Sequence, residues 1–248
     1  MSPRSSMPMG NFALPPFTRG VKWLLIATVA VSILVPITGA FGDKLKLLLA
    51  FIPAAFWHGY VWQPFTYTFL NPDPLGLVFA GLGLWLMGGS LEAMWGTRRF
   101  VTFYFATSVL AALATAVIGI FAGSVAGFAY FGNWVVIEAL AAAFAVSLPS
   151  ARIFLYFFPI EARLLLPISA GITLLFMIFY GPVPYLPQMF ALGAGVLFAG
   201  GVRTPKQLLL RLRVWWIDRR MRSRRLRVVR REDDVPGRGR SGSDKYLH

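Results

Sequence analysis

The sequence predicts an all-α, polytopic membrane protein: a bundle of six transmembrane helices with an interfacial outer loop after the first helix. The chain of 248 residues is 57% hydrophobic with a mean hydropathy of +0.64, which is too apolar for a soluble domain of this length. It contains six apolar stretches, each close to the roughly 20 residues that a membrane-spanning helix needs. Its lysine and arginine residues lie almost entirely on one side of these stretches.

The six apolar stretches place the spans near residues 21–42, 75–94, 99–121, 127–148, 164–182 and 184–202. Only Gly181-Pro182-Val183-Pro184, which has the composition of a tight turn, separates the last two. The predicted membrane domain therefore covers residues 21–202. Residues 1–20 are predicted to be a cytoplasmic N-terminal segment, and residues 1–16 lack the features of a cleaved signal peptide.

The positive charges predict the orientation of the spans. With the amino terminus in the cytoplasm, 22 of the 24 Lys and Arg residues fall on the cytoplasmic side, and only Lys44 and Lys46 fall outside. This is the asymmetry that the positive-inside rule describes. An even number of spans then places both termini in the cytoplasm, and we expect an integral protein of a bacterial cytoplasmic membrane.

Residues 43–74, the outer loop, are long for a connection between spans and rich in aromatic residues, among them Trp57, Tyr60 and Trp62. Amphipathic aromatic side chains favour the membrane interface, so we expect a partly helical loop in the outer leaflet. An ordinary aromatic belt explains the same composition without any function. Irregular backbone at membrane depth must be buried in protein or line a water-filled cavity, so the loop implies a compact bundle beneath it.

Residues 203–231 combine apolar and basic side chains, as an interfacial amphipathic helix does. Each basic residue near an anionic bilayer contributes about 1 kcal/mol. The expected partner is therefore anionic lipid of the bilayer, and nucleic acid is the less favoured one. Residues 232–248 are expected to be disordered. The predicted membrane-surface residues are Arg211, Arg213, Trp215, Trp216, Arg219 and Arg220.

The residue types limit the chemistry that the chain can perform. Cysteine is absent, which excludes disulfides, thiolate metal sites and cysteine nucleophiles. The two histidines are His58 and His248. Because His248 is the last residue of a polar tail, His58 is the realistic candidate for a catalytic imidazole. We expect neither a cofactor nor a bound metal.

Three motifs stand in the predicted bundle. They are Trp62-Gln63-x-Phe65-Thr66-Tyr67-x-Phe69-Leu70 in the outer loop, Gly88-Gly89-Ser90-Leu91-Glu92 ending the second span, and Gly96-x-Arg98-x-Phe100 opening the third. Together they resemble the motifs of the rhomboid family. The resemblance covers roughly residues 20–202 and implies the six-helix rhomboid fold. Active rhomboids are intramembrane serine proteases, whereas relatives such as the Derlins share the fold without catalysis.

The resemblance also implies where catalytic residues would stand. Registered on Pro149-Ser150-Ala151-Arg152, the nucleophile position falls on Trp134, and the base position of the last span falls on Leu192. The two positions that assist the oxyanion fall on Gly76 and Ala80. A serine nucleophile needs a neighbouring base, and these positions supply neither. The chain is therefore predicted to be a catalytically inactive member, not an enzyme.

Glu138 is the carboxylate that lies deepest in an apolar stretch, one helical turn after Trp134 and on the same face. An ionisable group inside a membrane is a functional candidate by default. One interpretation is a protonated carboxyl group hydrogen-bonded between helices, to Ser169, Thr173 or Tyr180. A second is that Asn133, Trp134 and Glu138 line a vestigial cavity and recognise a client helix. A third, a proton or ion relay, would need another acid or base.

These observations lead to one expected function and two alternatives. We expect a non-catalytic binder or escort of transmembrane client proteins, with the outer aromatic loop as a gate. The first alternative is a divergent intramembrane serine protease that uses His58, for which Ser124 is the least implausible nucleophile. The second is a small-solute or proton carrier that uses Glu138.

Overall fold

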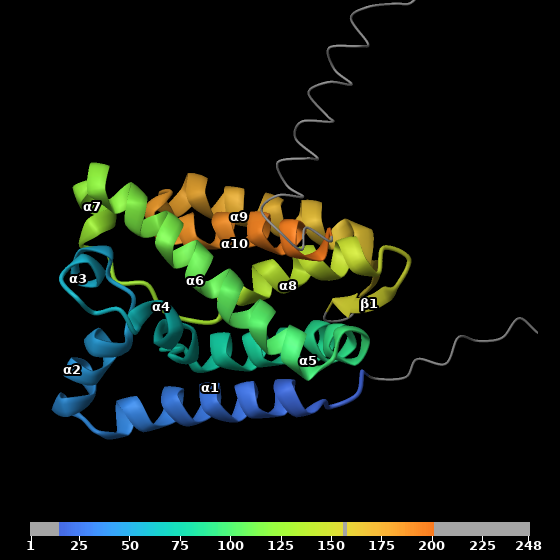
Figure 1. The fold of residues 1–248 in the computed structure, drawn as a ribbon, viewed down its shortest axis with the longest axis horizontal. Helices are drawn as coiled ribbons and strands as arrows, with labels where there is room; N and C mark the ends of the chain where they lie inside the picture. Colours follow the sequence, from blue (N-terminus) through green and yellow to red (C-terminus); the bar gives the residue numbers. More distant parts are fainter. Residues whose placement is uncertain (1–14, 156–157, 201–248) are drawn as a thin grey trace, which may run out of the picture. The chain divides into compact units, whose positions relative to one another are not determined.

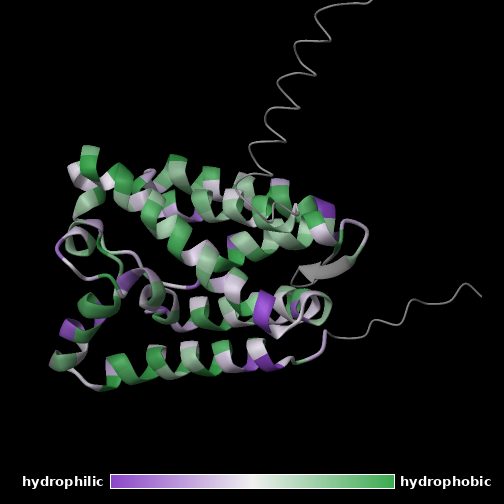
Figure 2. Cartoon of the chain, in the orientation of Figure 1, coloured by the Kyte–Doolittle hydropathy of each residue, from purple (hydrophilic) through white to green (hydrophobic). Residues whose placement is uncertain are grey.

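The computed structural model describes residues 15–155 and 158–200 and is mostly helical (Figure 1). Six longer helices correspond in order to the six predicted apolar stretches. Hydrophobic residues predominate along these helices (Figure 2). These helices are α1 (Arg19–Ile37), α5 (Pro74–Trp95), α6 (Thr97–Phe121), α8 (Trp134–Ser147), α9 (Leu165–Tyr180) and α10 (Leu186–Ala199). Helix α6 crosses the bundle obliquely (Figure 1).

Four helical segments of the described chain are long and apolar enough to cross a membrane: Arg19–Ile37, Pro74–Trp95, Thr97–Phe121 and Ala162–Tyr180. Two shorter apolar helices accompany them, Trp134–Ser147 and Val183–Ala199. The chain is thus a mostly helical polytopic membrane protein. The prediction of six full-length spans goes beyond this finding, because a 14-residue helix such as α8 is only about 21 Å long.

The helix predicted from residue 127 begins only at Trp134. Tyr130 instead forms an antiparallel bridge with Phe51, with N···O distances of 2.9 and 2.8 Å. Gly132 then adopts a φ of 97°, a left-handed conformation that favours glycine and that a helix cannot continue through. The backbone before α8 is therefore tied to other segments rather than to a helical ladder.

A β-hairpin separates α8 from α9 and departs from the predicted all-α class. Strands β1 (Arg152–Leu155) and β2 (Phe158–Glu161) pair antiparallel, with Arg152 opposite Glu161 and Ile153 opposite Ile160. Aromatic and β-branched residues favour such pairing. The pairing also satisfies backbone groups that an irregular connection would leave open. We call this end of the bundle the hairpin end.

The short elements between α1 and α5 gather at the opposite end, which we call the loop end (Figure 1). Tyr67 is fully buried, and its hydroxyl donates to the carbonyl oxygen of Ser108 at 3.1 Å. Burial raises the pKa of Tyr67 above its usual range. Ser108 in turn donates to the carbonyl oxygen of Pro64 at 2.9 Å, so these elements are fastened to α6. They are α2 (Ala40–Leu49), α3 (Pro53–Trp57), α4 (Gln63–Thr66) and η1 (Tyr67–Phe69). The remaining short helices are α7 (Gly123–Ala126), η2 (Ala162–Leu164) and η3 (Val183–Tyr185).

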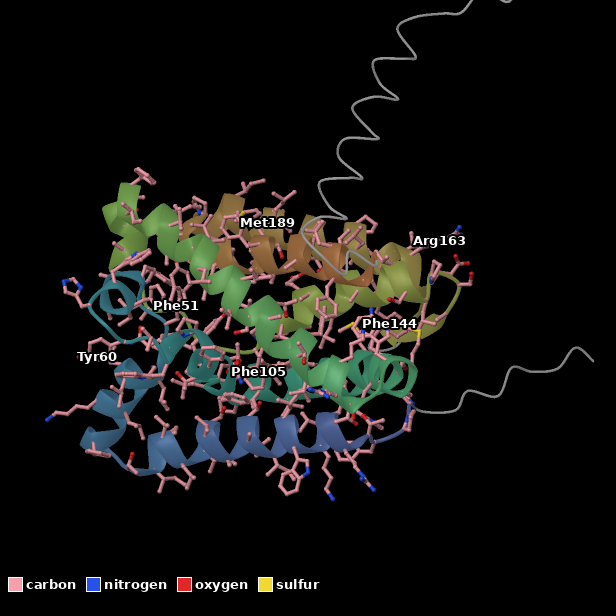
Figure 3. All side chains as sticks on the ribbon, in the orientation of Figure 1. Phe51, Tyr60, Phe105, Phe144, Arg163 and Met189 are labelled. Carbon is pink, nitrogen blue, oxygen red and sulfur yellow. The ribbon has the colours of Figure 1, made fainter. Side chains whose placement is uncertain are left out.

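Helix α8 lies in the core of the bundle and packs against α5, α6, α9 and α10. Side chains fill the space between these helices, and Figure 3 shows Phe144 of α8 within them, between Phe51 at the loop end and Arg163 at the hairpin end. Helix α10 approaches α8 closely at Gly195, where an added Cβ would collide with the carbonyl oxygen of Ala139. A small residue at this position therefore sets the distance between the two helices.

Glu92, near the carboxyl end of α5, holds the start of α1 at the hairpin end. Its side chain is almost fully buried, and it accepts hydrogen bonds from the backbone N–H groups of Gly20 and Val21, both at 2.8 Å. The hydroxyls of Thr18 and Thr97 also donate to it. A carboxylate at a helix amino terminus satisfies unpaired N–H groups and interacts favourably with the helix dipole. One side chain thus joins the ends of α1, α5 and α6.

We expect Glu92→Ala to destabilise the protein by about 3 kcal/mol or more, because it leaves several buried donors without an acceptor. Glu92→Gln should cost less, because one acceptor oxygen remains. The control is Glu161→Ala, which removes a Glu161–Arg163 ion pair whose side chains are 40% and 69% exposed; such pairs contribute about 1 kcal/mol at most. The measurement is thermal unfolding of the detergent-solubilised protein. Equal shifts for Glu92→Ala and Glu161→Ala would contradict the expectation.

Gly195→Ala should destabilise the protein by about 1–3 kcal/mol, because the methyl group meets backbone and forces α8 and α10 apart. Gly193→Ala on the same helix provides the matched control, since nothing lies within 4 Å of its added Cβ. Alanine is the better helix former, so Gly193→Ala should leave the unfolding temperature unchanged or slightly higher. The close approach of the two helices would be refuted by identical unfolding temperatures for the two variants.

Candidate functional site

A cavity of about 190 Å³ lies between α5, α8 and α9, and we call it the α5/α8/α9 cavity. Its wall is almost entirely apolar. The lining residues with polar side-chain atoms are Glu138, Ser169 and Trp134. The lining residues are Phe79, Leu82, Gly83, Leu86, Met87, Trp134, Ile137, Glu138, Ala141, Leu165, Ile168, Ser169 and Ile172.

The carboxyl group of Glu138 links α8 to α9. The Thr173 hydroxyl donates to Oε1 at 2.9 Å, and the Ser169 hydroxyl donates to Oε2. Ser169 and Thr173 are four residues apart, which places both on one face of α9. The hydrogen bonds predicted for these two residues are therefore confirmed, whereas Tyr180 makes none to Glu138 and is exposed.

The site lies near the middle of the helices that enclose it. Gly83, the tenth of the 22 residues of α5, faces Ile137, whose Cδ1 would be 3.5 Å from an added Cβ. Ser169 and Thr173 flank the midpoint of the segment Ala162–Tyr180. The contacts with α5 and α9 thus place Glu138 about halfway between the two ends of the bundle.

The structure brings Trp134 and Glu138 together but places Asn133 elsewhere. Trp134, the first residue of α8, lines the α5/α8/α9 cavity and is 39% exposed. Asn133 is fully buried outside that cavity, and its backbone N–H donates to Oδ1 of Asn71 at 3.3 Å. Both side-chain polar atoms of Asn133 and Nδ2 of Asn71 have no hydrogen-bond partner among the described residues. Burial of these amide groups therefore destabilises the fold, because some of their polar atoms lose water without gaining a hydrogen bond.

The other positions implied by the family resemblance lie outside the cavity wall. Leu192 is half-buried in α10, and Ala80 is fully buried in α5. Gly76 belongs to the amino-terminal cap of α5, where its N–H donates to Oδ2 of Asp73 at 2.6 Å. The structure therefore does not gather Gly76, Ala80 and Leu192 around Trp134 at this cavity.

His58 lies exposed at the end of α3, with its Nδ1 2.7 Å from the carbonyl oxygen of Ala54. In the part of the chain that the structure describes, no serine hydroxyl is hydrogen-bonded to this imidazole. Ser124 is exposed in α7. Within residues 15–155 and 158–200, no three His, Asp or Glu side chains come together as a metal site would require.

The residues of the three sequence motifs act in helix packing and loop anchoring. Trp62 donates its indole N–H to the carbonyl oxygen of Leu48 at 3.1 Å, and the buried Gln63 accepts the N–H of Ile52 at 3.1 Å. Gly88 and Gly89 allow close contacts, Gly96 turns the chain between α5 and α6 with a φ of 81°, and Arg98 is exposed.

Ser169 lines the cavity, whereas the sequence predicted it only as a hydrogen-bond partner of Glu138. The four-residue spacing between Ser169 and Thr173 in an otherwise apolar helix indicates a shared polar face. The apolar walls from α5 and α9 carried no signal of their own, because their residues resemble lipid-facing ones. Arg211, Arg213, Trp215, Trp216, Arg219 and Arg220, predicted at the membrane surface, lie outside the described residues.

Comparison with known proteins identifies the family. The family model described as "Eukaryotic integral membrane protein (DUF1751)" matches residues 21–199, well over half of the chain. No curated protein matches the chain. Because the family is eukaryotic, the prediction of a bacterial cytoplasmic membrane is wrong: apolar length and charge asymmetry report insertion into a bilayer but not which bilayer. The chain belongs to DUF1751, a family of eukaryotic integral membrane proteins.

Proposed function

We propose that this protein is a catalytically inactive, rhomboid-like membrane protein of six spans that binds transmembrane partner proteins from the side. The observation that carries the proposal is the α5/α8/α9 cavity, an apolar pocket with one carboxyl group halfway along the bundle. The long apolar helices that enclose it belong in a bilayer, so its natural occupant is a group that approaches from the bilayer.

The rim of the α5/α8/α9 cavity favours lateral access. Leu82 of α5 and Ile172 of α9 line it and are 37% and 45% exposed, so its wall reaches the surface of the bundle. Helices in lipid associate through packing and hydrogen bonds rather than through the hydrophobic effect. The α5/α8/α9 cavity, with apolar walls and the carboxyl-bearing Glu138 among its lining residues, offers both kinds of interaction.

The loop end supports access between α5 and α9 rather than beneath an opening outer loop. No residue of the outer loop lines the cavity. The Thr66 hydroxyl donates to the carbonyl oxygen of Leu49 at 2.9 Å, and the indole of Trp57 donates to that of Ala116 at 3.3 Å. With the Phe51–Tyr130 bridge, these bonds fasten the loop in place, so the expected gate role has no geometric support.

The lack of a nucleophile and base favours binding over proteolysis. Trp134 has no hydroxyl and Leu192 has no basic atom, whereas general-base activation needs both groups within hydrogen-bond reach. The carrier alternative receives less support for a similar reason. The other carboxyl group in a long apolar helix, that of Glu92, is held by four donors at the hairpin end, and it offers Glu138 no neighbouring relay group.

The proposal predicts that Gly83→Phe abolishes lateral partner binding by filling the cavity. An added Cβ at Gly83 meets only side-chain atoms, the nearest at 3.5 Å, so the larger side chain can extend into the hollow. The measurement is photo-crosslinking in native eukaryotic membranes from a photoreactive residue at Ile172, on the cavity rim. We expect the crosslinked adducts to fall at least about tenfold, equivalent to 1.4 kcal/mol of binding.

Gly171→Phe is the matched control, because Gly171 is exposed on α9 and nothing lies within 4 Å of its added Cβ. It should leave the Ile172 adducts unchanged. A photoreactive residue at Phe179, on the exposed outer face of α9, reports general lipid and protein contacts. Adducts at Ile172 that survive Gly83→Phe would contradict the proposed binding site.

A further inference from the structure

We propose that the partner recognised at the α5/α8/α9 cavity is a transmembrane helix with a lysine or arginine near its middle, whose cationic group binds the carboxyl of Glu138. This inference rests on the proposed function and adds the chemistry of the partner. It is carried by the hydrogen-bond capacity of Glu138, the charge around it and its depth in the bundle.

The carboxyl groups of Glu92 in α5 and Glu138 in α8 differ in how many hydrogen-bond acceptor positions remain unused. A carboxylate offers about four acceptor positions. Glu92 receives four donors and is almost fully buried at the hairpin end. Glu138 receives two hydroxyl donors, both from α9, and it lines the α5/α8/α9 cavity. Glu138 can therefore accept further donors from an occupant.

Within residues 15–155 and 158–200, no Lys, Arg or His lines the α5/α8/α9 cavity beside Glu138. The ion pair found among these residues joins Arg163 to Glu161 at the surface. Opposite charges attract most strongly where the dielectric constant is low. An occupant that brings a cation thus gains more at this carboxyl than one that brings a neutral donor.

The depth of the site matches the position at which a helix most needs such a partner. Glu138 lies level with the middle of α5 and with the middle of the segment Ala162–Tyr180. A lysine or arginine at the centre of a membrane span is unfavourable when it faces lipid, and such residues are usually paired. When this side chain enters the cavity, its charged group leaves the lipid and contacts the carboxyl group of Glu138.

The dimensions and walls of the cavity suit one long basic side chain rather than a whole helix. A volume of about 190 Å³ holds a single large side chain. The leucine, isoleucine and methionine walls contact the methylene stem, while the head group reaches Glu138. The ring of Trp134, one turn nearer the loop end, offers a cation–π contact during approach.

The test is binding of synthetic single-span helices to the full-length protein in lipid vesicles, followed by energy transfer. The helices are identical except at the central residue, which is Lys, Ser, Leu or Glu. We expect the Lys helix to bind at least about tenfold more tightly than the Leu helix. Glu138→Gln should remove this preference while the protein stays folded, as an unchanged unfolding temperature would show. Glu161→Gln, at the surface, should preserve it.

The outcomes separate this inference from the proposed function. If Leu and Lys helices bind equally and Gly83→Phe abolishes both, lateral binding stands and the basic-residue requirement is overturned. Binding of the Ser or Glu helix as tight as that of the Lys helix overturns it as well. If no helix binds in a manner that Gly83→Phe changes, the proposed function itself fails, and the inference fails with it.

Discussion

A carboxyl group buried in an apolar bundle needs hydrogen-bond donors from the protein itself. At Glu92 this requirement brings the ends of α1, α5 and α6 together. Its four donors come from the chain preceding α1, the first turn of α1 and the first residue of α6. Gly20 is part of the same arrangement, because an added Cβ would lie 2.8 Å from Glu92 Oε2. The Glu92 carboxylate therefore accepts backbone donors at the amino terminus of α1 and contacts Gly20 closely. These contacts fix the ends of α1, α5 and α6 relative to one another.

The two ends of the bundle are fastened by different means, and the cavity lies between them. At the hairpin end, Glu92 acts together with Arg99, which stacks over Trp95 and Phe198 at 5.1 and 5.9 Å. At the loop end, side chains bind backbone carbonyls, as in the hydrogen bond from Tyr130 to Val183 at 3.0 Å. Helix α9 is the least buried of the long apolar segments, and Glu138 is its main polar link to α8. The α5/α8/α9 cavity lies against this least buried helix.

The sequence predicts helices reliably where apolar runs are long, since a bilayer leaves no other way to satisfy the backbone of a crossing segment. It predicts the partners of Glu138 for a related reason: Ser169 and Thr173 are the polar residues that helical spacing places on one face. It fails where partners lie far apart in the chain. The Phe51–Tyr130 bridge that delays α8 and the donors that Thr18, Gly20 and Val21 provide to Glu92 depend on such distant partners. The cavity depends on how three helices diverge, which periodicity does not encode.

The capping of α1 by Glu92 also bears on how the protein is made. Gly20 and Glu92 are 72 residues apart, so α1 leaves the ribosome long before its acceptor is synthesised. Until α5 is complete, the first N–H groups of α1 have to be satisfied by water or lipid head groups at the membrane surface. The exchange of those temporary partners for Glu92 can occur only once two helices are inserted side by side. Assembly of the bundle is therefore coupled to completion of its second long helix.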